Sequence, residues 1–262
     1  MQSCINELCD VAKAKGVLFL PGAEEEFNGV NTGLETWILA LQRKYNRDRP
    51  FMYYTYQTYL KETPPRLVRH LALAKEEGFM PAIKLVRGAY LKSEPKELVF
   101  SSFEETSECY DGLVKALLTR RWNSALPSQS RNQQFPERIG LMLATHNIDS
   151  IRKAQSIRDE QIRGKASELN NVELSYAQLQ GMADEISCEL VEASKTTPGA
   201  GVAKTDRPRP FKAATWGSIQ ECLNFLVRRA SENQDALGRT METRVAMGKE
   251  LKRRFWSGIG LR

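Results

Sequence analysis

The stretch that decides the fold is AIKLVRGAY, residues 82–90. It begins as an apolar run interrupted only by Lys84, which is typical of a strand buried in a parallel sheet. The run is followed by Arg87, Gly88, Ala89 and Tyr90. A cation beside buried apolar residues needs an anion, and glycine lets the backbone approach a ligand closely. Two cations pointing into water would also fit a strand end, but the whole pattern favours an anion site.

Length and composition indicate a single folded domain over residues 1–262, with 41% hydrophobic and 27% charged residues. The net charge is +6 and the isoelectric point is about 9.0. Basic residues are scattered among acidic ones, without a block of like charges or a basic run interleaved with aromatics. We therefore expect a mildly basic surface around an anionic ligand site, and no nucleic-acid partner.

Cysteine and histidine usage argues against a metal site. The chain has five widely spaced cysteines and two histidines, with no C-x-x-C pair. Free thiols in a reducing compartment are the expectation. No apolar run is long enough to span a membrane, and the N-terminus resembles neither a signal peptide nor a transit peptide.

Strands and helices alternate along the chain, which predicts a parallel sheet. Polar loops are expected at about 123–136 and 191–210, where prolines gather. Seven candidate strands are predicted at 17–20, 51–57, 82–86, 139–143, 172–179, 186–190 and 211–215. Helices are predicted at 1–15, 29–45, 64–78, 104–121, 218–234 and 241–255, and around 151–154.

Unusual polar side chains fall just after these strands, as in a (β/α) barrel, where ligand groups lie at the carboxyl ends of the strands. A doubly wound sheet would place them similarly, so both arrangements remain open at this point. The polar residues are Glu24, Gln57, Lys84, Arg87, Thr145, His146, Gln178 and Lys212.

Near the C-terminus, Arg228 and Arg229 precede Glu232 on a predicted helix. Two adjacent guanidiniums suit a carboxylate, and Glu232 is placed to hold one of them. A solvated helix face of this composition is common, so this motif alone favours no site.

Five motifs in order resemble the proline dehydrogenase family, in its eukaryotic and especially fungal branch. They are YTYQTYLK (54–61), KLVRGAY (84–90), ATHN (144–147), YAQLQGMAD (176–184) and LVRRASEN (226–233). The resemblance runs from about residue 5 to residue 255. It implies a flavoenzyme on a (β/α)8 TIM barrel whose first strand is missing from this chain.

The resemblance implies FAD across the strand ends. Lys84 and Arg87 would face the flavin and its phosphates, and with Tyr90 they would be the catalytic residues. His146 could instead be a core histidine, although its place directly after a strand favours the ligand role. The remaining assignments are Gln57 at the flavin ring, Gly88, Ala89 and Tyr90 lining the cofactor, Thr145 and His146 at its phosphate and ribitol, and Gln178 and Gly181 near the adenine.

Arg228 and Arg229 would grip the substrate carboxylate, oriented by Glu232. The implied reaction is hydride transfer from Cδ of L-proline to flavin N5, which gives Δ1-pyrroline-5-carboxylate, with electrons passing to a quinone. In that division of labour the cofactor does the redox chemistry and the protein positions it. Family membership further implies the mitochondrion and allows peripheral membrane association.

The chain departs from the family pattern in three places. Gly22 stands where the family has an acidic residue, Ala213 where it has a tyrosine, and the first strand with its lysine is missing. An alanine beside the substrate weakens its positioning. A non-catalytic or decayed relative that keeps the barrel as a binding or regulatory protein is therefore the alternative to an active dehydrogenase.

Overall fold

The computed structural model describes residues 2–22, 30–88, 90–91, 94–164, 171–195, 207–232 and 237–258. Its centre is a parallel sheet of five strands, each paired with the next along the chain. The strands are β1 (Tyr54–Gln57), β2 (Ala82–Val86), β3 (Ile139–Ala144), β4 (Val172–Leu179) and β5 (Pro210–Ala213).

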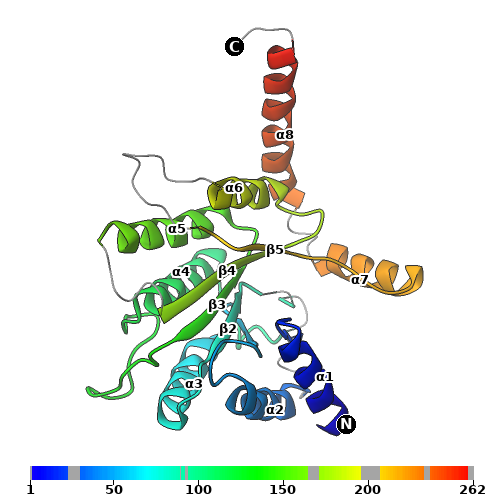
Figure 1. Ribbon diagram of the computed structural model, residues 1–262. Helices are drawn as coiled ribbons and strands as arrows, with labels where there is room; N and C mark the ends of the chain where they lie inside the picture. Colours follow the sequence, from blue (N-terminus) through cyan, green and yellow to red (C-terminus); the bar gives the residue numbers. More distant parts are fainter. Residues whose placement is uncertain are drawn as a thin grey trace.

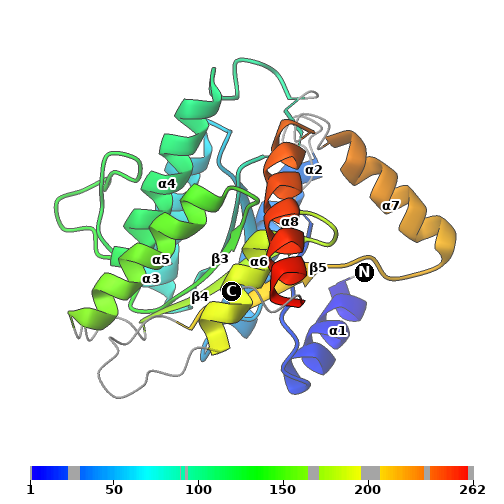
Figure 2. The same cartoon turned by 90° about the horizontal axis from the view of Figure 1, so that it is seen from above.

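Eight helices are described around and beyond this sheet (Figures 1 and 2). Helices α2 to α6 flank the sheet, whereas α7 and α8 extend away from it. The helices are α1 (Gln2–Ala14), α2 (Val30–Tyr45), α3 (Thr63–Glu77), α4 (Phe103–Thr119), α5 (Ile148–Arg163), α6 (Asp184–Lys195), α7 (Ile219–Glu232) and α8 (Leu237–Gly258).

The strand order decides between the two predicted arrangements. In a doubly wound sheet the order reverses at a switch point, whereas in a barrel each strand lies beside its predecessor. Here the order is β1-β2-β3-β4-β5 throughout. Helices α2 to α6 contribute to one core with one face of this sheet, which we call the outer face. The protein is therefore an α/β fold of the barrel type, with the described strands forming an open arc.

Strand alternation divides β2 between two environments. Ile83 and Leu85 pack into the large core under the helices. Side chains of a strand alternate between the two faces of a sheet, so Ala82, Lys84 and Val86 lie on the opposite, inner face. Ala82 belongs to a separate small cluster there. The strand prediction at 82–86 is confirmed.

Two buried amides on α2 fasten the amino ends of the first strands. Gln42 donates to the carbonyl oxygens of Met52 (3.0 Å) and Ala82 (2.9 Å). Asn46 donates to Met52 and Met80 and accepts the Met52 amide at 2.9 Å. Buried backbone groups beyond a strand end are costly when unpaired. These side chains therefore hold the register of β1 and β2 at the end opposite to the predicted site.

A chain of polar contacts joins β1 to α3 and α2 on the outer face. The Tyr56 hydroxyl lies 2.7 Å from Nδ1 of His70, and Nε2 of His70 lies 3.0 Å from Glu35 Oε1. Tyr56 and His70 are both buried. The His70 hydrogen bond is the main reason that the pKa of Glu35 is lowered. The three groups therefore supply one another's hydrogen-bond partners, because the buried His70 ring has little access to water.

Two strand predictions fail. Residues 186–190 are helical and lie within α6, because Ile186 and Leu190 are buried at a spacing of four and share one helix face. Residues 17–20 form only an isolated bridge, in which Phe19 pairs with Met52 beside the free edge of β1. The predicted loop at 191–210 begins with the last turns of α6, and 196–206 lie outside the described residues. The loop at 123–136 holds no helix or strand.

Candidate functional site

Lys84 is the cation that the sheet places on its inner face. It lies between Thr55 of β1 and Met142 of β3 in the strand register, and its side chain is half-buried. Among the residues described, its ammonium forms no hydrogen bond or ion pair. Burial lowers the pKa of Lys84, and the positive charge of Arg229 lowers it further. Lys84 is thus a desolvated cation whose surroundings favour an added anion.

Helix α7 brings Arg229 within electrostatic range of Lys84. Its side chain is half-buried, and the guanidinium lies 5.3 Å from the centre of the Phe225 ring. Arg228, one position earlier on the helix, is exposed. Glu232 ends the helix, and its side chain lies outside the described residues. Of the predicted carboxylate grip, Arg229 is the part whose positive charge acts on Lys84.

Gln57 ends β1 with its side chain buried. Because Tyr54 and Tyr56 pack on the helices, alternation places Gln57 on the inner face, as it does Lys84. In the register it is level with Val86, and Val86 with Ala144. Val86 and Ala144 are partly exposed on the inner face beyond Lys84, and Gln57 adds one amide beside them. A flat ring system fits such a surface, since small residues let it approach the strands.

Arg87 points to the outer face, away from Lys84. Its guanidinium donates to the hydroxyls of Ser107 on α4 (2.8 Å) and Ser150 on α5 (2.7 Å). It also stacks near the rings of Phe103 and Tyr110, at 5.2 and 5.1 Å. The sequence predicts that both cations face one ligand, but in the structure they lie on opposite faces of the sheet. Arg87 is built into the contact between β2, α4 and α5.

Gly88 lies against an aromatic ring. A Cβ atom at this position would come within 1.4 Å of Cδ1 of Tyr59, and the φ angle of +154° also excludes most side chains. Close approach to a neighbouring side chain therefore requires this glycine, whatever else binds there. Tyr90 is half-buried, and its carbonyl accepts the amide of Glu94 at 3.1 Å. Ala89 lies outside the described residues.

The predicted residues after β3 and β4 are joined to one another. Nε2 of His146 accepts the Leu179 amide at 3.1 Å, which assigns the ring proton to Nδ1. Gln178 is buried, and its Oε1 accepts the Ser187 hydroxyl of α6 at 3.1 Å. Thr145, also buried, accepts the Asn147 amide at 3.1 Å. These bonds hold the two strand ends together. Gly181 is exposed with φ of +75°, which suits the tight turn after β4.

Sequence reasoning missed four residues that organise this region. Ser107 and Ser150 hold Arg87, and Tyr59 and Glu94 contact each other across the loop after β2. Ser150 carried a local signal, because it lies three residues after the helix cap Asn147. In the described part of the chain no group of histidine, cysteine, aspartate and glutamate is arranged to hold a metal ion.

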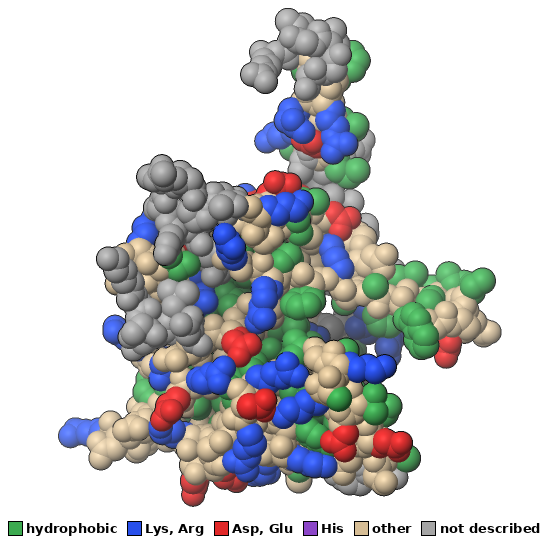
Figure 3. Space-filling model, viewed as in Figure 1, with side chains coloured by type: hydrophobic (Ala, Val, Ile, Leu, Met, Phe, Trp, Pro, Cys, Tyr) green, Lys and Arg blue, Asp and Glu red, His purple; other side chains and the backbone are tan. Residues whose placement is uncertain are grey.

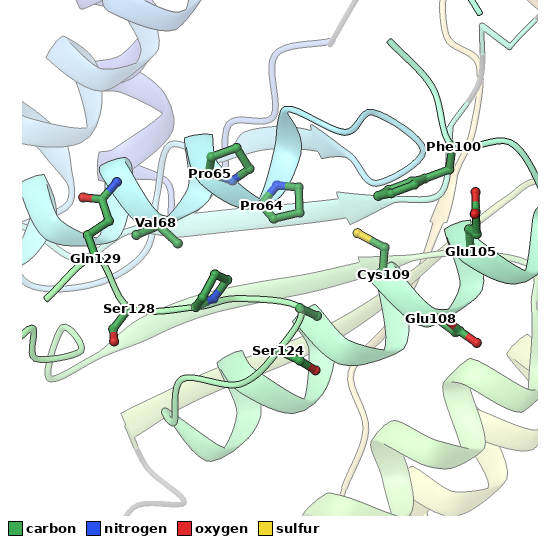
Figure 4. Close-up of a pocket in the computed structure, with 12 residues that line it drawn as sticks. Pro64, Pro65, Val68, Phe100, Glu105, Glu108, Cys109, Ser124, Ser128 and Gln129 are labelled. Atoms are coloured by element: carbon green, nitrogen blue, oxygen red, sulfur yellow. The ribbon is translucent and has the colours of Figure 1, made fainter. Parts of the chain in front are cut away.

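A groove of about 590 Å³ lies outside the sheet, between α3, α4 and the loop at 123–136 (Figure 4). Pro64 and Pro65 form one wall, and Cys109 of α4 faces them across the groove. Burial raises the pKa of the Cys109 thiol to about 12, so that it stays protonated and unreactive near neutral pH. The groove is on the helix layer and is separate from Lys84 and Gln57.

Comparison with known proteins gives a family. The sequence profile described as "Proline dehydrogenase" matches residues 4–242. The chain is 30% identical over 257 residues to the probable mitochondrial proline dehydrogenase of Schizosaccharomyces pombe, covering 96% of this chain and 49% of that protein. It is 31% identical over 269 residues to proline dehydrogenase 1, mitochondrial, of Arabidopsis thaliana, covering 97% and 47%.

A third relative is the hydroxyproline dehydrogenase of Rattus norvegicus, 29% identical over 267 residues, covering 97% of this chain and 51% of the relative. The chain therefore spans about half the length of these three relatives. Among solved structures, proline utilization A (PutA) from Bdellovibrio bacteriovorus, inactivated by N-propargylglycine, is similar with a TM-score of 0.61 and 20% identity, covering 86% of this chain and 20% of that one.

A PutA mutant from Bradyrhizobium japonicum gives the same TM-score of 0.61 at 21% identity, over 87% of this chain and 21% of that one. At such identities the structures support the fold, which agrees with the sequential strand order observed here. The sequence profile and the curated relatives carry the assignment further. The chain belongs to the proline dehydrogenase family.

Proposed function

We propose that this chain binds FAD and oxidises L-proline to Δ1-pyrroline-5-carboxylate, or a closely related cyclic imino acid to the corresponding cyclic imine. The observation that carries the proposal is the pair formed by Lys84 and Arg229. A half-buried ammonium without an anionic partner in the described residues lies near a second cation on α7. Such a pair favours a bound carboxylate, which every substrate of this class has.

In this proposal Arg229, with Arg228 beside it and Glu232 to orient them, binds the substrate carboxylate. Lys84 faces the same space from the sheet. Oxidation removes a hydride from Cδ and a proton from the ring nitrogen, so that the C–N bond becomes C=N. The positive charges also lower the pKa of a bound amine, which favours the neutral form that can lose hydride.

FAD would supply the hydride acceptor when bound. On the inner face, Gln57 is placed to hydrogen-bond a flat ring, and Val86 and Ala144 leave room for it. Gly88, Ala89 and Tyr90 remain candidates for the loop beside the cofactor, and Thr145, His146, Gln178 and Gly181 for its more distant part. For Arg87, the contacts with Ser107 and Ser150 favour an indirect role.

Mitochondrial location is part of the same proposal, because two of the three relatives reported above are named as mitochondrial. A quinone acceptor is proposed from the family resemblance alone. Association with a membrane surface is supported by α8. Its exposed side chains include Leu251, Phe255 and Trp256, and the run of cations 252–254 lies between Leu251 and Phe255. Basic and apolar side chains are mixed on this helix in Figure 3. Apolar and basic groups on one helix suit an anionic lipid surface. No helix of the described ranges is long and apolar enough to cross a bilayer.

The alternative is a non-catalytic member of the family. It is favoured by Gly22, which brings no charge to the site, and by Ala213, whose exposed methyl group ends β5. Neither residue contacts Lys84 through a hydrogen bond or ion pair, since the Lys84 ammonium has none in the described chain. The alternative predicts that added substrate does not reduce the flavin, whether or not the chain binds the cofactor.

The deciding experiment is the visible absorption spectrum of the purified protein with FAD, before and after anaerobic addition of proline. Loss of the oxidised flavin bands on addition of proline supports the proposed activity. A yellow protein that proline does not bleach would place the chain in the non-catalytic class with a retained cofactor. A protein that stays colourless in FAD would overturn the cofactor proposal as well. Hydroxyproline in a parallel sample separates the two candidate substrates.

A further inference from the structure

We propose that Tyr59 and Glu94 are positioning residues that fix the path of the loop after β2. This inference rests on the proposed function, because that loop contains the residues we assign to the side of the cofactor. Neither Tyr59 nor Glu94 is itself assigned to cofactor or substrate. Their contribution is the shape of the backbone that carries Gly88 and Tyr90.

The backbone of residues 58–59 continues the pairing of β1 with β2 past the strand ends. The Thr58 amide donates to the Val86 carbonyl, and the Tyr59 amide donates to the Arg87 carbonyl, both at 2.8 Å. The exit of the chain from β2 is therefore held by two hydrogen bonds to one neighbouring turn. This fixes the backbone as far as Arg87.

The ring of Tyr59 fixes the next residue. It lies where a side chain at Gly88 would be, with its Cδ1 and Cε1 atoms 1.4 and 2.1 Å from an ideal Cβ. The tyrosine is 3% exposed, so its ring has no alternative position in solvent. Gly88 and Tyr59 are thus fitted to each other, because a side chain at position 88 would overlap the ring.

The hydroxyl of Tyr59 reaches the far side of the loop. It donates to Oε1 of Glu94 at 3.3 Å, and Glu94 is only 5% exposed. The Glu94 amide in turn donates to the Tyr90 carbonyl at 3.1 Å. Burial and the neighbouring Glu94 carboxylate raise the pKa of Tyr59, so the hydroxyl keeps its proton and remains a donor. One side chain thereby ties together positions 88 and 94.

The return of the loop is held by the same turn. Leu60 pairs with Val99 in an antiparallel bridge, and the Lys61 amide donates to the Leu98 carbonyl at 2.9 Å. Tyr59, Leu60 and Val99 form a small buried cluster of their own, separate from the core under the helices. A change in this cluster is therefore expected to alter the loop more than the global fold.

The experiment compares two matched substitutions, Tyr59→Phe and Tyr56→Phe. Each removes one buried tyrosine hydroxyl and its hydrogen bond, but Tyr56 bonds to His70 on the outer face. Three quantities are measured on the full chain: FAD dissociation constants by flavin fluorescence, melting temperatures, and hydrogen exchange of the amides at 87–91 without FAD. Tyr59→Phe is expected to raise the FAD dissociation constant about tenfold and to speed exchange at 87–91, because a lost buried hydrogen bond of this kind weakens a site by that order.

Tyr56→Phe is expected to lower the melting temperature with little change in FAD affinity or in exchange at 87–91. Glu94→Gln keeps a carbonyl oxygen that accepts from Tyr59 and should behave like the wild type, whereas Glu94→Leu should reproduce Tyr59→Phe. Equal effects of Tyr59→Phe and Tyr56→Phe on all three quantities would overturn the positioning role. If the wild type binds no FAD, the proposed function fails, and the exchange measurement still decides whether Tyr59 holds the loop.

Discussion

The ammonium of Lys84 on β2 and the guanidinium of Arg229 on α7 lie close enough that the positive charge of Arg229 lowers the pKa of Lys84. A partly buried ammonium without an anionic partner in the described chain destabilises the protein, and the neighbouring positive charge of Arg229 adds to that cost. The pair therefore links a cost in stability to a capacity for binding. Both sides of that link can be measured.

The stability side predicts the effect of Lys84→Met. Because the folded pKa of Lys84 is below its ordinary value of 10.5, the charged lysine destabilises the fold at neutral pH, and this penalty fades as pH rises toward 10.5. Lys84→Met is expected to raise the melting temperature at pH 7 by about 2 °C. The difference from the wild type should shrink in scans at pH 9 to 10. A gain that stays constant with pH would show that packing, and not charge, is responsible.

The binding side predicts that Arg229→Met raises the proline requirement by about 100-fold with FAD retained, since a charge-assisted contact to the carboxylate is lost. Arg228→Met should have a smaller effect, because Arg228 is exposed. Arg253→Met is the control, since Arg253 pairs with Glu250 on the exposed face of α8. Steady-state kinetics over a range of proline concentrations measure all three. Unchanged kinetics in Arg229→Met would contradict the assignment.

Substitution of Arg87 tests whether this residue stabilises the fold or binds the cofactor directly. Its bonds to Ser107 and Ser150 tie the end of β2 to α4 and α5, so Arg87→Met should destabilise the fold by about 1–3 kcal/mol. Denaturant unfolding gives this free energy. Ser150→Ala should show a fraction of the same loss. If Arg87→Met left the free energy of unfolding unchanged and abolished FAD binding, Arg87 would be a direct cofactor ligand after all.

The contact between His70 and Glu35 predicts that the protein loses stability as the pH falls into the acid range. The folded pKa of Glu35 is lowered, so its contribution is complete above the ordinary value of 4.5 and is lost as pH falls through the folded value. Glu35→Gln should therefore flatten the fall in melting temperature between pH 5 and pH 3. Glu62→Gln, on an exposed carboxylate that pairs with Arg69, serves as the control. Identical acid profiles for wild type and Glu35→Gln would refute the linkage.

The contact between Gly88 and Tyr59 predicts that alanine is more harmful at position 88 than at position 181. Gly88→Ala places a methyl group inside the Tyr59 ring position, so it should disturb the loop and lower FAD affinity at least tenfold. Gly181→Ala also puts a side chain at a positive φ, of +75°, but meets no atom within 4 Å. It should cost only about 1 kcal/mol in unfolding free energy. Thermal unfolding and FAD titration of both variants separate the contact from the backbone strain.

Much of the sheet was predictable because its strands carry strong periodic patterns. The strands at 82–86 and 172–179 were predicted with their observed bounds. The segment at 186–190 was mistaken for a strand because its apolar residues, at every second position, fit a strand, whereas Ile186 and Leu190 are also four apart and share the buried face of a helix. The choice between barrel and doubly wound sheet needed the strand order, which no local pattern contains.

The sequence predicted which residue types form the site, but less well to which face of the sheet each side chain points. Lys84 and Arg87 are three positions apart, so strand alternation alone predicts that they lie on opposite faces of the sheet. The neighbourhood of Lys84 and Arg229 joins residues far apart in the chain, and only the folded structure supplies it. The same holds for Tyr59 and Glu94, whose contact spans 35 positions.

The amides of Gln42 and Asn46 have a consequence for how this scaffold changes over evolutionary time. They fasten β1 and β2 at the amino ends through the backbone, so the register of these strands does not depend on the loops at the other end. Substitutions in those loops therefore need not preserve the alignment of the strands. Loop sequences can then diverge within a lineage while the fastened end preserves the fold.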